Sequence, residues 1–245
     1  MIWKQHHSVC DGASIISYIN ATGDTYDLDA MIPIRKVPLY KRLLLFLGIP
    51  FYLPGAMLAS MKTKMLKNPL HDGKRDLSGQ RHIATSKLYE FSEIKEAAHR
   101  WKETINDFTI ACMACALKEY FIQAGDSMTD RVNIIIPANI RFGHYQKVED
   151  IRMENHFSVV PLTIPLRDDL KASIQEVPRI TRQLHSGFGP IYATYIMVRV
   201  AASIFPHWLM QKFINFTSKP FTLAYSNVPG LFKPSAINGA KQIMG

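Results

Sequence analysis

The sequence predicts an α/β fold, with helices and strands arranged in layers. Its 245 residues are 47% hydrophobic and 20% charged, which suits one large or two small globular domains and excludes a disordered chain. Residues 132–137 are apolar except for Asn133, as in a buried strand. Apolar helical patterns stand between segments of this kind, and the mixture is typical of a layered α/β domain.

The first elements follow from hydrophobic spacing and from turn residues. Residues 1–4 predict the end of a strand, residues 6–12 predict a turn, and residues 13–20 predict a helix. Residues 21–38 predict mostly loop, because they contain two prolines and a glycine–aspartate turn.

An apolar segment follows at residues 43–61, where Tyr52 is the only ionisable side chain. Basic residues flank it on both sides: Arg35, Lys36, Lys41, Arg42, Lys62, Lys64 and Lys67. The length approaches that of a membrane span, but helix-breaking residues interrupt the segment at Gly48, Pro50, Pro54 and Gly55. We expect two short helices in a hairpin or one element at a membrane interface. Ordinary core helices and a true span stay open.

The remaining elements alternate in type. Strands are predicted at three further places: residues 83–91, 157–164 and 221–225. Helices are predicted at four: from a Ser92 cap to residue 101, from an Asn106 or Asp107 cap to residue 124, over 168–184, and over 191–216 with a break near Pro206. Residues 226–230 predict a turn.

The formal net charge of +9 admits nucleic acid, an anionic membrane surface or an acidic small substrate as a partner. The basic residues look scattered rather than striped, and no recognition helix, RNA-binding strand motif or zinc finger is evident. We therefore expect no nucleic-acid partner. Cys10, Cys112 and Cys115 cannot form a closed disulfide framework, which indicates a reducing compartment.

The strongest chemical signal is the HHxxxDG pattern of residues 6–12. A neutral imidazole, such as that of His6 or His7, is a good general base near pH 7. Asp11 can hold the turn by pairing with an arginine or with backbone amides, and Gly12 permits backbone angles that other residues resist. A merely structural turn is the plain alternative. A metal site would need a third ligand, and no second motif completes one, so no metal is expected.

The pattern resembles the active-site motif of the CoA-dependent acyltransferase superfamily. Four later segments resemble motifs of one branch, the wax ester synthase/diacylglycerol acyltransferase (WS/DGAT) family: Asn106-Asp107 opening an apolar helix, PANIR ending at Arg141, NHFSVV beginning at Asn155, and SNVPG beginning at Ser226. The five motifs follow the family's order from His6 to Gly230, so the resemblance covers nearly the whole chain.

The resemblance implies a two-lobed fold like that of chloramphenicol acetyltransferase, with the active site in a channel between the lobes. Residues 1–80 would be the end of the first lobe with the apolar insertion, and residues 81–245 most of the second lobe. In the family a substantial stretch precedes HHxxxDG, and here only 15 residues follow Gly230, without a clear final element. We therefore expect the fold to be incomplete at both ends. We therefore expect the chain alone to be poorly soluble and to have little transferase activity.

The resemblance also implies transfer of a fatty acyl group from acyl-CoA to a hydroxyl of diacylglycerol or of a long-chain alcohol. By the match, His7 is the general base, His6 is its neighbour and Asp11 is mainly structural. We take Asn227 or Ser226 as the candidate donor to the oxyanion. The other motif positions are Gly12, Asn106, Asp107, Arg141 and Asn155.

Acyl-CoA would be a co-substrate, and no cofactor is implied. The apolar substrates favour a membrane or lipid-droplet surface, at the cytoplasmic face of the endoplasmic reticulum or plasma membrane. Two alternatives stay open: a catalytically silent lipid-binding or interaction protein with the same fold, and a condensation-type acyltransferase. Asn106-Asp107 also fits a plain helix N-cap, and Arg141 fits an ion pair with Asp11 or another acid.

Overall fold

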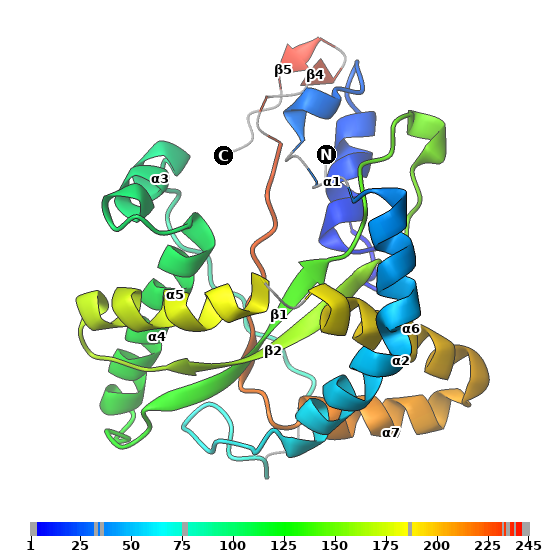
Figure 1. The fold of residues 1–245 in the computed structure, drawn as a ribbon. Helices are drawn as coiled ribbons and strands as arrows, with labels where there is room; N and C mark the ends of the chain where they lie inside the picture. Colours follow the sequence, from blue (N-terminus) through cyan, green and yellow to red (C-terminus); the bar gives the residue numbers. More distant parts are fainter. Residues whose placement is uncertain are drawn as a thin grey trace. The chain divides into compact units, whose positions relative to one another are not determined.

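The computed structural model describes residues 4–31, 34, 37–74, 78–185, 188–231, 233, 236–237 and 239–241. Its mixture of helices and strands confirms the predicted α/β class (Figure 1). The expected strand end at residues 1–4 falls almost entirely outside the described residues, and Lys4 has no regular structure.

The chain divides into two compact units, and each is discontinuous along the sequence. The first unit contains residues 1–49, 137–158 and 226–245, and the second contains residues 50–136 and 159–225. The assignment of residues 1–80 and 81–245 to two lobes of a larger fold stays a prediction.

The main sheet has the strand order β2-β1-β3. These strands confirm three of the predicted ones: β1 (Arg131–Asn139), β2 (Phe157–Pro165) and β3 (Leu223–Ala224). β1 and β3 are parallel, with Ile134 opposite Leu223 and Ile135 opposite Ala224. β2 lies at the edge of the sheet, which explains how it accommodates Pro161, because edge strands tolerate proline.

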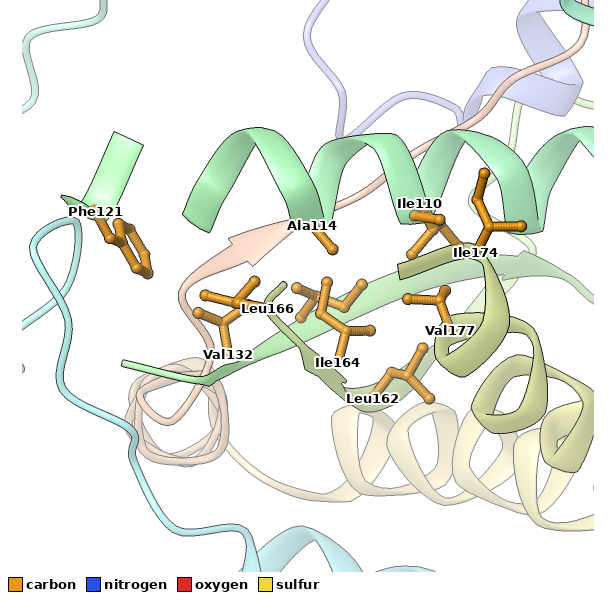
Figure 2. Close-up of a cluster of buried hydrophobic side chains, with 11 residues drawn as sticks. Ile110, Ala114, Phe121, Val132, Leu162, Ile164, Leu166, Ile174 and Val177 are labelled. Carbon is orange, nitrogen blue, oxygen red and sulfur yellow. The ribbon is translucent and has the colours of Figure 1, made fainter. Parts of the chain in front are cut away.

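The hydrophobic core of the second unit lies where two helices, α4 (Ile105–Gln123) and α5 (Leu170–His185), pack against each other and against the strands. Figure 2 shows α4 running along the strands with Ile110 and Ala114 turned toward them. The buried members of this core are Ile110, Ala111, Ala114, Phe121, Val132, Ile134, Leu162, Ile164, Leu166, Ile174 and Val177.

The apolar segment forms one helix, α2 (Leu39–Lys62), so the predicted hairpin of two short helices is wrong. Pro50 and Pro54 lie inside α2 and are exposed, so water can satisfy the carbonyl groups that lack a helical donor. Their spacing of four residues places both interruptions on the same side of the helix. In the described part of the chain, no helix combines the length and the apolar character that a membrane crossing needs.

Two helix starts and one strand also differ from the prediction. Residues 83–90 form no strand and are exposed, because no neighbouring strand pairs with them in the described structure. Helix α3 (Phe91–Arg100) begins after Glu90 rather than at a Ser92 cap. Helix α4 is capped by Thr104, whose side chain accepts a hydrogen bond from the Asp107 amide, and not by Asn106 or Asp107.

The predicted break near Pro206 is confirmed, since it separates α6 (Phe188–Ile204) from α7 (His207–Ser218). The first unit contains the predicted helix α1 (Gly12–Ala21), together with two short 3₁₀ turns, η1 (Leu28–Ala30) and η2 (Val148–Asp150). It also contains an antiparallel pair that the sequence analysis missed, β4 (Ala236–Ile237) with β5 (Ala240–Lys241).

Candidate functional site

The HHxxxDG segment forms a tight turn that leads directly into α1. The Val9 amide donates to the His6 carbonyl at 3.0 Å, which closes the turn. Asp11 is the N-cap of α1, where its Oδ1 accepts a hydrogen bond from the Ser14 amide at 2.9 Å. The motif therefore has two parts, an exposed turn with the histidines and a buried helix start with the aspartate.

Asp11 also forms a buried ion pair with Arg141, which confirms one of the partners considered for that arginine. Arg141 Nη1 lies 2.9 Å from Asp11 Oδ2, and both side chains are only 7% exposed. The His156 amide donates to the same Oδ2 at 2.7 Å. The carboxylate thus joins three segments of the first unit: the start of α1, the end of β1 and the residues before β2.

Arg141 makes further hydrogen bonds that hold these segments in place. Its Nη2 donates to Ser14 Oγ at 2.8 Å and to the Glu154 carbonyl at 3.2 Å. Its Nη1 donates to the His156 carbonyl and to Asn139 Oδ1, each at 3.3 Å. A planar guanidinium with several donors suits this position, because a lysine would supply a single charged centre.

The ion pair also affects the titration of Asp11. Burial raises the pKa of its carboxyl, but hydrogen bonds from Arg141, Ser14 and His156 and the charge of Arg141 outweigh burial. The resulting pKa lies below the ordinary value of 3.8, so Asp11 is ionised at neutral pH. An ionised carboxylate that is already paired and buried is a structural group and a poor proton carrier.

Asn155 holds the backbone of the histidine turn. Its Nδ2 donates to the His7 carbonyl at 3.2 Å and to the Ser8 carbonyl at 3.0 Å. This contact gives the asparagine of NHFSVV a physical role, because it fixes the backbone that carries the His7 side chain.

The two histidine side chains have different surroundings. The Nδ1 atom of His6 lies 2.8 Å from Ser8 Oγ and 3.2 Å from the Ser8 amide, which donates to it. His7 is exposed, and its ring meets the Phe157 ring edge-on, with the ring centroids 6.4 Å apart. Within the described residues, the imidazole of His7 makes no such local hydrogen bond, so it is the more accessible of the two rings.

Gly12 brings the SNVPG segment against the start of α1. A Cβ atom on Gly12 would lie 2.9 Å from Val228 Cγ2, closer than side chains normally approach. The absence of a side chain at Gly12 therefore permits this contact. Ser226 and Asn227 belong to the same segment and are exposed. Six predicted site residues thus share the first unit with Ser226 and Asn227: His6, His7, Asp11, Gly12, Arg141 and Asn155.

Asn106 and Asp107 belong to the second unit, at the start of α4. Asp107 is buried, and the Thr104 hydroxyl donates to its Oδ2 at 2.6 Å. The Thr181 hydroxyl of α5 donates to its other oxygen. Asp107 therefore joins α4 to α5, whereas Asn106 is exposed.

Several residues of these networks were missed by the sequence analysis. Ser14 and Thr104 each stand three residues from an aspartate, which is the spacing of helix capping and could have identified them. Glu154 directly precedes the NHFSVV motif, and His156 is its second residue. Thr181 carries no sequence signal, because only the packing of α5 on α4 brings it to Asp107.

A cavity of about 400 Å³ also opens in the first unit, lined by Tyr145, Glu149, Asp150, Arg152 and Glu154. Its three carboxylates would repel the phosphate groups of CoA, so we do not assign it to that ligand. Among the described residues, no group of three or more histidine, cysteine, aspartate or glutamate side chains is placed to hold a metal ion.

Comparison with known families gives one match. Residues 153–242 match the model of the WS/DGAT C-terminal domain. The matched region begins just before Asn155 and includes Ser226 and Asn227, whereas the HHxxxDG motif and Arg141 lie before it. No curated protein matches the chain.

Proposed function

We propose that this chain, which its C-terminal domain at residues 153–242 places in the WS/DGAT family, transfers a fatty acyl group from acyl-CoA to a hydroxyl group. The acceptor is diacylglycerol or a long-chain alcohol, and the product is a triacylglycerol or a wax ester. The family match suggests an acyltransferase, and the acceptor and the roles of single residues are our proposal.

One observation carries the proposal. The first residues of the matched domain hold the HHxxxDG segment in place: Asn155 bonds the His7 and Ser8 carbonyls, and the His156 amide bonds the Asp11 carboxylate. The segment that the family model identifies is therefore physically joined to the motif that the model does not cover.

In the proposed mechanism His7 is the general base. It takes the proton of the acceptor hydroxyl as the oxygen attacks the thioester carbon, because alcohols ionise poorly at neutral pH. Collapse of the tetrahedral intermediate breaks the carbon–sulfur bond, and the proton passes from His7 to the departing CoA thiolate. Positioned base catalysis of this kind contributes about 10²–10⁴-fold. Asn227 or Ser226 would donate to the oxyanion.

We extend the proposal to the fold, the cofactor requirement and the location of the protein. The fold is that of a two-lobed, chloramphenicol acetyltransferase-like enzyme, with acyl-CoA as co-substrate and no further cofactor. The protein works at the cytoplasmic face of a membrane or at a lipid droplet, where its apolar acceptors reside. The exposure of α2 supports this location, since Leu43, Phe46, Leu47 and Phe51 are each at least 60% exposed.

The test is an ester-formation assay with acyl-CoA and either a long-chain alcohol or diacylglycerol. We expect His7→Ala to lower turnover by at least about 100-fold while acyl-CoA binding persists. His6→Ala, the matched control, should cost less because its imidazole is engaged by Ser8. Normal turnover by His7→Ala would refute the mechanism.

A further inference from the structure

Helices α6 and α7 expose many large apolar side chains. The exposed ones, including Phe205 between the helices, are Val200, Ile204, Phe205, Trp208, Leu209, Phe213, Ile214 and Phe216. In α7, which is described throughout, Met210 alone is buried. Water-exposed surface of this kind marks a site of interaction, because monomeric soluble proteins seldom expose so many large apolar groups together.

The apolar residues of α7 are arranged on one side of the helix. At 100° per residue, Trp208, Leu209, Phe213 and Phe216 fall within an arc of about 140°. Lys212 lies in the same arc, with its Nζ 5.3 Å from the centre of the Trp208 ring. A cation held over an interfacial tryptophan is typical of amphipathic helices whose lysine reaches from apolar surface toward polar headgroups.

In the sequence, the segments that contain these helices carry charges of only one sign. Of the 29 basic residues, 14 fall into two segments without any aspartate or glutamate, residues 30–71 and 177–245. Each contains seven lysine or arginine residues. The rest of the chain contains 15 basic residues and all 20 acidic ones. Helices α2, α6 and α7 thus belong to segments of the sequence without aspartate or glutamate, whereas the rest of the chain has more acidic than basic residues.

The second half of α2 contacts α6 within the second unit. A Cβ atom on Gly189, near the start of α6, would lie 2.7 Å from the Tyr52 ring, so the ring covers this glycine. Phe51 and Leu58 of the same half are exposed. Lys64 and Lys67 follow the helix and add positive charge. Apolar exposure and positive charge therefore continue from α7 and α6 to this part of α2.

We infer that α7, with the adjoining end of α6, binds the surface of an anionic lipid bilayer. Trp208, Phe213 and Phe216 enter the boundary between headgroups and acyl chains, and Lys212 and Lys219 meet lipid phosphates. The lipid surface is favoured because it supplies negative charge and an apolar interior at once, which the lysines and the exposed apolar side chains of α7 complement. The inference deepens, and rests on, the membrane location in the proposed function, and it adds a second contact besides α2.

Vesicle partition tests the inference without any acyl-CoA or acceptor, so its outcome is separate from that of the transferase assay. We expect the protein to partition at least about tenfold more onto phosphatidylcholine vesicles with 30% phosphatidylserine than onto pure phosphatidylcholine. Trp208→Ser/Phe216→Ser should lower partition onto the anionic vesicles by about tenfold. Lys212→Gln should lower it about fivefold, with little change on neutral vesicles.

The matched control is Gln211→Ser/Ile214→Ser, which alters exposed positions on the opposite side of the same helix. Partition within twofold of the unmodified protein is expected, and thermal melting should be unchanged in every variant. Equal losses from both double variants, or no binding to anionic vesicles, would overturn the inference. A lipid-free dimer that Trp208→Ser/Phe216→Ser dissociates would also overturn it, because the face would then bind a second copy.

Trp208 provides a direct reading of its own position. In a Trp3→Phe/Trp101→Phe variant, we expect its fluorescence to shift to shorter wavelength with anionic vesicles and to be quenched by lipids brominated on the acyl chain. Vesicle binding without quenching would assign the membrane contact to α2 alone and would refute the role of α7, while leaving the proposed acyl transfer intact.

Discussion

Helices α1 and α4 both begin beside a buried aspartate, but the two carboxylates have different partners. Asp11 accepts hydrogen bonds from two backbone amides and pairs with the Arg141 guanidinium. Asp107 accepts from the hydroxyls of Thr104 and Thr181. The first arrangement joins segments distant in sequence through a charge pair, and the second joins two helices of one core through neutral donors. The same residue type thus supports a candidate active site in one place and ordinary packing in the other.

The largest effect should come from removing the charge of Asp11. We expect Asp11→Ala to lower the free energy of unfolding by about 3–5 kcal/mol, because it leaves the buried Arg141 guanidinium without its counter-ion. Urea denaturation measures the loss. Asp11→Ala/Arg141→Met should recover a substantial part of it, since both charges are then absent. A loss under about 1 kcal/mol would mean that the pair contributes no more than an exposed one.

The start of α1 should also be sensitive to added volume. We expect Gly12→Ala to cost about 1–3 kcal/mol, since the new methyl group would meet Val228 Cγ2. Gly143→Ala is the control in the same unit, because an added Cβ there meets nothing within 4 Å. Val228→Ala in the Gly12→Ala background should restore part of the stability. Equal melting temperatures for Gly12→Ala and Gly143→Ala would contradict the close contact.

The start of α4 should respond more weakly to loss of one hydroxyl. We expect Thr181→Val, which keeps the side-chain shape, to cost about 1–2 kcal/mol because a buried Asp107 oxygen loses a donor. Thr194→Val removes a hydroxyl that bonds a backbone carbonyl within α6 and should cost under about 0.5 kcal/mol. A Thr181→Val effect no larger than that of Thr194→Val would show that Asp107 does not depend on α5.

The smallest effect is a pH dependence specific to Asp11. Its pKa is lower in the folded protein, so its contribution to stability is present above the unfolded value and is lost as the pH falls through the folded value. The stability difference between the unmodified protein and Asp11→Asn should be constant above about pH 5 and should shrink below about pH 4. Urea titrations from pH 7 to pH 2.5 measure this stability difference. A difference that grows toward acid pH would mean that folding raises the pKa of Asp11 instead of lowering it.

The sequence predicted elements whose pattern is complete within a short stretch. The buried strand at residues 132–137 is of this kind because local hydrophobicity decides it. The helical break at Pro206 is of this kind because proline lacks the backbone amide donor that a helix needs. The strand predicted at residues 83–91 is wrong because a strand also needs a partner, which no local pattern supplies. The hairpin at residues 43–61 is wrong because exposed prolines four residues apart can be tolerated within one helix.

The candidate site was predictable where a motif carried it. HHxxxDG pointed to Asp11 and to an arginine partner, and the ion pair with Arg141 is present. Asn155 could be singled out but not explained, since its bonds to the His7 and Ser8 carbonyls depend on segments more than 140 residues apart. Thr181 could not be found at all, because an isolated threonine in a helix gives no signal of a buried partner.

The long separation between Asp11 and Arg141 also sets the order in which the site can form. The two residues are 130 positions apart, and residues 50–136, which lie between them in the sequence, belong to the second unit. At a synthesis rate of about 5–20 residues per second, a ribosome needs on the order of 10 s after adding Asp11 before Arg141 exists. During that interval the histidine turn has neither its charge partner nor Asn155. The turn therefore becomes fixed late in folding, by contacts of high sequence separation that close slowly.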